Sequence, residues 1–205
     1  MIRTTKLFLV TATYVALGSS ASVEAQTAKE PHDTHICAFN GLTYAELGAS
    51  YQDASPEAQA VISWITQQAG LRNDFDLHGA TFERSPIAFA AIRHGHRQIV
   101  YDVDKFSAKN GELAWEDIAI LAHEIAHHIN GDTALHKADS HAKELTADFY
   151  AGMIVRRLGG TRENALAVTK MLSEEGSETH PPRKDRENAF GSGWDHADRL
   201  VRNGQ

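Results

Sequence analysis

A pair of histidines four residues apart constrains this chain more than any other feature of its sequence. His123 and His127 belong to the run His-Glu-Ile-Ala-His-His-Ile-Asn-Gly-Asp, which spans residues 123–132. Residues four apart lie on the same face of an α-helix, so both imidazole rings can bind one ion. Glu124 completes the pattern H-E-x-x-H, which is typical of a zinc-binding helix whose glutamate is a general base. The alternative is a surface helix with incidental histidines, because short patterns also match by chance.

The residues around this pattern predict a helix from about Glu112 to Ile129. Apolar residues recur at helical spacing along it, which indicates a half-buried helix. Asn130-Gly131 is a stop signal, because glycine tolerates the left-handed conformation just past a helix end. The apolar positions are Ile118, Leu121, Ala122, Ile125, Ala126 and Ile129.

A hydrolytic zinc site uses three protein ligands and leaves one position for water. Glu144 is the best candidate for the third ligand, because it lies on a second predicted helix, from about His141 to Leu158. Two antiparallel helices with a short link would bring it back to the same ion. Asp148 is one turn further along on the same face, where it can accept a hydrogen bond from a ligand imidazole. The alternative is that both acids belong to an exposed helix face.

The N-terminus has the composition of an export signal. Arg3 and Lys6 supply positive charge before a short, mostly apolar run. Val23-Glu24-Ala25 then fits a cleavage site before Gln26. We expect residues 1–25 to be a signal peptide and the mature protein to be exported, either periplasmic or secreted. The alternative is an uncleaved membrane anchor, for which the apolar run is short. We expect no stable membrane span in the mature form.

The rest of the chain predicts one domain over residues 55–205, after a loosely ordered lead-in over residues 26–54. The net charge of −7 and the lack of a long basic run exclude nucleic acid as an expected partner. Cys37 is the single cysteine, so no internal disulfide can form.

Other signals place strands and helices around the two central helices. Apolar runs at 87–92 and 98–101 flank His94-Gly95-His96, which predicts a hairpin with the two histidines as turn residues rather than ligands. One further helix is predicted to begin at Ser55-Pro56. Three more are predicted over about 162–175, 183–190 and 194–203.

Three motifs in order resemble the zinc metallopeptidase family of HtpX and the CAAX prenyl protease, a gluzincin-type family, and especially its soluble exported BepA-like branch. The motifs are H-E-x-x-H followed by Gly131-Asp132, then Glu144-x-x-Ala147-Asp148, then Thr179-His180-Pro181-Pro182 with a following Arg186. The resemblance covers about residues 85–190. It implies an α+β fold: a mostly helical, zincin-like metallopeptidase domain with a small β-sheet.

The resemblance also implies roles for individual residues. It implies three zinc ligands, which are His123, His127 and Glu144. Glu124 would be the general base and proton shuttle, and Asp148 would orient a ligand histidine. His180 would lie near the metal, either as a fourth ligand that keeps the enzyme latent or as a catalytic group that stabilises the oxyanion. Arg186 would fix the His180 loop or bind substrate.

Together these features predict a zinc metalloendopeptidase that hydrolyses peptide bonds of exported or envelope proteins. We expect the polypeptide substrate to add as an extended strand along an edge near Ala88–Arg93. The alternatives are a non-proteolytic, chaperone-like zinc-binding module, with His180 closing the coordination sphere, and a hydrolase of non-peptide amides. The chain lacks the transmembrane helices and the long repeat domain found in family members, so their substrates and partners are not carried over.

Overall fold

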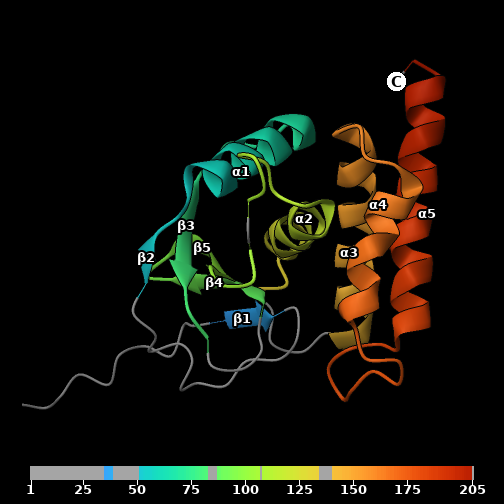
Figure 1. The fold of residues 1–205 in the computed structure, drawn as a ribbon. Coiled ribbons are helices and arrows are strands. Elements are labelled where there is room, and N and C mark those ends of the chain that lie inside the picture. The colour runs from blue at the N-terminus through green and yellow to red at the C-terminus, as the bar shows by residue number, and fades with distance from the viewer. Residues whose placement is uncertain (1–34, 39–50, 83–86, 107, 134–139, 205) are drawn as a thin grey trace, which may run out of the picture. The chain divides into compact units, whose positions relative to one another are not determined.

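The computed structural model describes part of the chain, and the predicted signal peptide over residues 1–25 lies outside it. The described residues are 35–38, 51–82, 87–106, 108–133 and 140–204. They belong to one compact unit, Asp33–Gln205, which combines five α-helices with a small mixed sheet (Figure 1). The expected α+β class is therefore confirmed.

The sheet has five strands in the order β1-β4-β5-β3-β2, and only β3 and β5 run parallel. The predicted hairpin is confirmed: its turn residues, His94 and Gly95, have φ values of 50° and 78°. Positive φ at both turn positions is typical of the tight turn that matches the twist of paired strands. The strands are β1 His35–Ala38, β2 Gln52–Asp53, β3 Phe75–Ala80, β4 Ala88–Arg93 and β5 His96–Asp102.

Two of these strands lie where the sequence indicated only a loosely ordered lead-in. β1 and β2 both fall within residues 26–54 and form the two outer positions of the sheet. As a result, β4 is not an edge strand, because β5 pairs with one side of it and β1 with the other. The expectation of a free edge along Ala88–Arg93 is wrong. Pairing between segments so far apart in the chain leaves no local pattern from which it could be predicted.

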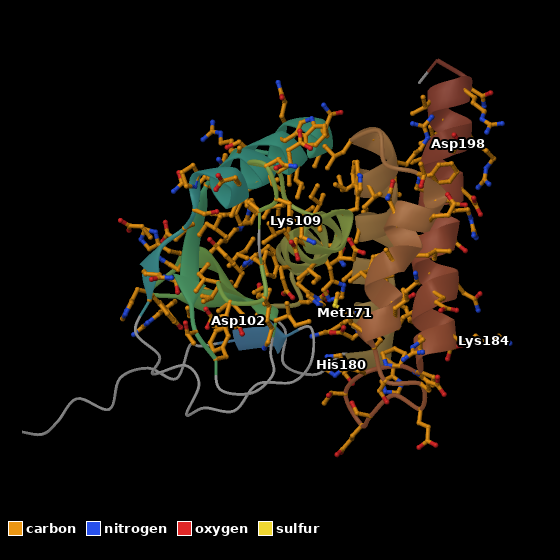
Figure 2. All side chains as sticks on the ribbon, in the orientation of Figure 1. Asp102, Lys109, Met171, His180, Lys184 and Asp198 are labelled. Carbon is orange, nitrogen blue, oxygen red and sulfur yellow. The ribbon has the colours of Figure 1, made fainter. Side chains whose placement is uncertain are left out.

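The helix that carries His123 and His127 is the central layer of the unit. This helix, α2, packs against β4 and β5 on one side and against α3 on the other (Figure 1). Side chains fill the spaces on both sides of α2 (Figure 2). The predicted bounds of α2 and α3 were close to those observed. The helices are α1 Pro56–Ala69, α2 Trp115–Asn130, α3 Ser140–Arg157, α4 Arg162–Ala167 and α5 Arg183–Arg202. None of the described helices is long and apolar enough to cross a membrane.

The C-terminal part corrects two predictions. The predicted helix over 162–175 is shorter, because α4 passes into a 3₁₀ turn at Val168–Met171 and ends there. The two helices predicted over 183–190 and 194–203 are one continuous helix, α5. Gly191 and Gly193, near the middle of α5, do not interrupt it, and both lie in close packing contacts.

The contact between α3 and α5 requires a glycine on each helix, Gly152 on α3 and Gly193 on α5. A Cβ atom added at Gly193 of α5 would lie 1.9 Å from the backbone oxygen of Phe149 on α3. A Cβ atom added at Gly152 of α3 would lie 2.1 Å from the backbone oxygen of Phe190 on α5. Any side chain at either position would force the two helices apart. The glycines therefore allow the backbones of α3 and α5 to approach, and this approach fixes the place of α5 beside the metal-ligand candidates.

Candidate metal centre

Three buried side chains from two helices converge in the space between α2 and α3. The Nε2 atoms of His123 and His127 lie 3.0 Å apart. Each of these nitrogens lies 3.4 Å from one carboxylate oxygen of Glu144. The three residues each offer a ligand atom within 4.8 Å of the others, so they can hold a metal ion. The structure thus brings together the two histidines of the H-E-x-x-H pattern and the predicted third ligand.

A carboxylate orients each of the two imidazole rings. Nδ1 of His123 lies 2.8 Å from Oδ1 of Asp148, and Nδ1 of His127 lies 3.0 Å from Oδ2 of Asp132. An Nδ1–H that donates to a carboxylate leaves the Nε2 lone pair directed toward Glu144, as metal binding requires. Sequence reasoning placed Asp148 in such a role but assigned none to Asp132. The available signal was its position immediately after the helix-ending glycine.

Arg186 of α5 lies beside Asp148 and Glu144 and is almost completely buried. Its Nε and a terminal nitrogen donate to the two oxygens of Asp148 at 2.6 and 2.7 Å. A terminal nitrogen also lies 3.4 Å from Oε2 of Glu144. Burial acts to lower the pKa of Arg186, but the neighbouring charges, chiefly Asp148, outweigh burial and raise it. Arg186 therefore positions Asp148, and through Asp148 it positions the ring of His123.

Glu124 is the one carboxylate at this site that has no hydrogen-bond partner among the described residues. Its side chain is completely buried, and neither carboxylate oxygen accepts a hydrogen bond there. Burial raises the pKa of Glu124 to about 7, although the nearby His123 and His127 act to lower it. A buried, unpaired carboxylate with a pKa near neutrality can accept and return a proton under physiological conditions. Buried groups of this kind are rare unless they have a function.

His180 lies at the margin of the centre, in the loop between α4 and α5. Its Nε2 is 3.8 Å from Oε2 of Glu144, and its Nδ1 is 2.9 Å from the hydroxyl oxygen of Thr179. A tight turn holds the loop, since the backbone N–H of Ser177 donates to the carbonyl of His180 at 2.8 Å. The structure therefore brings His180 close to the ligand group without including it among the three converging residues.

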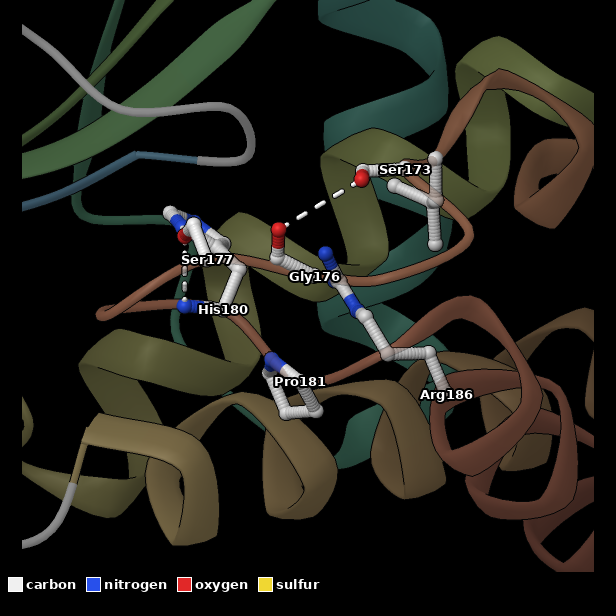
Figure 3. A pocket seen from close by; sticks show the side chains of 7 residues that line it. Ser173, Gly176, Ser177, His180, Pro181 and Arg186 are labelled. Carbon is white, nitrogen blue, oxygen red and sulfur yellow. Dashed lines mark hydrogen bonds between the residues drawn. The ribbon is translucent and has the colours of Figure 1, made fainter.

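A small pocket opens beside this loop. It has a volume of about 170 Å³, and both His180 and Arg186 contribute to its wall (Figure 3). Its other lining residues are Leu172, Ser173, Gly176, Ser177 and Pro181. The pocket gives space for a small group next to the candidate metal centre.

The neighbouring His128 is a core residue and not a ligand candidate. It points toward the sheet, where its Nε2–H donates to the backbone carbonyl of Gln98 at 2.9 Å. Its ring packs against Phe75, and burial lowers its pKa to about 4. His94 and His96 are exposed at the hairpin turn, as the sequence predicted.

Comparison of the chain with protein-family models, curated proteins and solved structures gives no match. The functional assignment therefore depends on the geometry of the site and on the three sequence motifs that converge there.

Proposed function

We propose that the protein is a zinc-dependent metalloendopeptidase. The observation that carries this proposal is the buried group of His123, His127 and Glu144 next to the unpaired carboxylate of Glu124. A purely structural metal site would have no use for a buried carboxylate that takes no part in ligation or hydrogen bonding. The N-terminal sequence supports a further proposal, that the protein acts on polypeptides outside the cytoplasm.

The donor set and its dimensions support zinc. Zinc takes imidazole nitrogens at about 2.0–2.1 Å in tetrahedral sites, which corresponds to about 3.3 Å between two ligand atoms. The three separations in the structure are 3.0, 3.4 and 3.4 Å. Two histidines and one carboxylate can also hold ferrous iron. The adjacent glutamate of the H-E-x-x-H pattern favours zinc, and metal analysis of the purified protein distinguishes the two ions.

Individual residues of the chain would then have separate roles in peptide hydrolysis. When bound, zinc would act as a Lewis acid that polarises the scissile carbonyl and acidifies a water molecule. Glu124 accepts the proton of the attacking water on a carboxylate oxygen and returns it to the leaving nitrogen. Asp148 and Asp132 keep the two imidazole rings in the required orientation. His180, at the rim, can donate a hydrogen bond to the negative charge that develops on the carbonyl oxygen.

The test pairs metal content with cleavage of casein as an unfolded polypeptide. We expect wild type to contain one zinc ion and to cleave. The Glu124→Gln variant should retain the metal and lose cleavage by about 10²- to 10⁴-fold, because it can no longer accept a proton. Glu116→Gln, on the first turn of the same helix, is the control and should behave as wild type. Equal cleavage by Glu124→Gln and wild type would refute the role of Glu124.

A second candidate function follows from the distance between His180 and Glu144. Nε2 of His180 lies close enough, at 3.8 Å, for a small movement of the loop to bring it to a shared ion. The protein would then be a latent protease or a non-proteolytic zinc-binding module. Faster cleavage by His180→Ala would support latency, and slower cleavage would support a catalytic role. Zinc in both proteins with no cleavage by either would support the non-proteolytic module.

A further inference from the structure

We propose that β1 occupies the position on the sheet where a peptide substrate binds, so that substrate must displace it. This inference rests on the proposed peptidase function and concerns how access to the same site is controlled. The feature behind it is the pairing of β1, His35–Ala38, with β4, Ala88–Arg93.

The strand that β1 covers is the one closest to the helix of the metal-ligand candidates. β4 and β1 both contact α2, which carries His123 and His127. Figures 1 and 3 both draw β1, in blue, on the side of the sheet nearer the loop that carries His180. A peptide that pairs with this side of β4 would therefore run beside the candidate metal centre.

The pairing uses the groups that a bound peptide would need. An extended peptide adds to a sheet by hydrogen bonding to a free row of backbone N–H and C=O groups. On this side of β4, residues Phe89–Ile92 are matched one to one with residues of β1. The other side of β4 belongs to the tight hairpin with β5. Only the β1 side can exchange partners without opening that hairpin.

Replacement of β1 by a peptide should have a small free-energy cost. A peptide that replaces β1 in the same antiparallel sense would restore the backbone hydrogen bonds that β1 gives up. β1 has only four residues, so few backbone hydrogen bonds between the two strands must break. A short strand from a distant part of the chain is thus suited to be a replaceable occupant of the binding edge.

The single cysteine of the chain lies in β1 and allows a direct test. Cys37 stands opposite Ala90 in the register of the two strands. Opposed residues of an antiparallel pair have Cα atoms about 4.5–5.5 Å apart, within the range that a disulfide bridges. The Ala90→Cys variant, oxidised with oxidised glutathione, should therefore hold β1 on β4. Ala91→Cys is the matched control, because this equally buried alanine faces the opposite side of the sheet.

We expect oxidised Ala90→Cys to cleave casein at least tenfold more slowly than the same protein reduced with a phosphine. Ala91→Cys should cleave equally fast under both conditions. If the oxidised and reduced forms of Ala90→Cys cleave equally, β1 is a permanent strand and the proposal is wrong. If Ala90→Cys forms no disulfide, the pairing itself is wrong and the proposal fails with it.

A second measurement needs no turnover. We expect casein to increase the rate at which iodoacetamide labels Cys37 in the Glu124→Gln variant, because displacement of β1 releases it from the sheet. An unchanged labelling rate would overturn the proposal. If no protein cleaves in any redox state, the proposed peptidase function is refuted, and the labelling rate alone decides whether a polypeptide displaces β1.

Discussion

Replacement of Arg186 by methionine tests the idea that a buried ion pair stabilises the fold around the candidate metal centre. Arg186 and Asp148 are both almost completely buried, and two hydrogen bonds of 2.6 and 2.7 Å join them. Methionine fills much of the same volume, so the main effect is to leave the Asp148 carboxylate without its counter-charge. The imidazole of His123 stays beside this carboxylate, at 2.8 Å.

The structure gives the expected size of this effect. Removal of one partner from a buried ion pair costs about 3–5 kcal/mol of unfolding free energy, because the other charge stays buried and unpaired. This cost is a large part of the roughly 5–15 kcal/mol by which folded domains are stable. The matched control is Arg162→Met, since the Arg162–Asp195 pair is about half exposed and joined at 3.2 Å. An exposed pair of this kind contributes about 0–1 kcal/mol.

Urea unfolding in the presence of a chelator measures both variants without a contribution from metal binding. A second change, Asp148→Asn, should recover part of the stability lost in Arg186→Met, because it removes the unpaired charge. If Arg186→Met and Arg162→Met lose equal stability, or if Asp148→Asn gives no recovery, the ion pair is not the source of the effect.

Three further predictions concern packing, metal affinity and pH. Gly193→Ala should lower the unfolding free energy by about 1–3 kcal/mol in urea unfolding, because its methyl group would collide with the backbone of Phe149. Asp132→Asn should weaken zinc binding by about 10- to 100-fold in chelator competition, because it loosens the ring of His127. Burial raises the pKa of Asp117 to about 6, so its folded form holds a proton that the unfolded chain releases, and stability falls as pH rises from about 4 to above 6. Asp117→Asn should remove this fall and raise stability at pH 7 by up to about 3 kcal/mol, with little change at pH 4.

Each of these predictions has an outcome that would contradict it, and the first also has a control variant. Ser192→Ala, at an exposed position beside Gly193, should leave stability unchanged, and an equal loss in both would exclude the helix contact as the cause. Unchanged zinc affinity in Asp132→Asn would show that His127 needs no support. A stability gain for Asp117→Asn that is the same at pH 4 and pH 7 would contradict a raised pKa.

Local patterns were enough to predict the two helices that carry the candidate metal-ligand residues. The helical spacing of apolar residues and the glycine after Asn130 placed α2 within three residues at its start and one at its end. The same reasoning predicted α3, which carries Glu144 and faces α2. These predictions succeeded because periodicity and helix-ending glycines act over a few residues of chain.

Features that depend on contacts between distant segments could not be predicted in the same way. Gly193 is an ordinary helix-breaking signal unless the backbone of α3 is known to pass beside it, and Gly191 is one unless the side chain of Arg162 is known to lie against it. The strand β1 becomes a strand only through its pairing with β4. The role of Asp132 depends on the direction in which the chain leaves α2, which brings its carboxylate to His127.

The charges around the candidate metal centre have a consequence for electroneutrality. Among the described residues, the carboxylates of Glu124, Glu144 and Asp148 lie near the guanidinium of Arg186, and a fourth carboxylate, that of Asp132, contacts His127. With neutral imidazoles and all four carboxylates ionised, these five side chains would carry three excess negative charges, and the three carboxylates near Arg186 are buried. A divalent cation would reduce this excess to one negative charge, which a single proton would neutralise. Metal binding should therefore release protons bound in the metal-free protein, and the number released can be measured during a zinc titration.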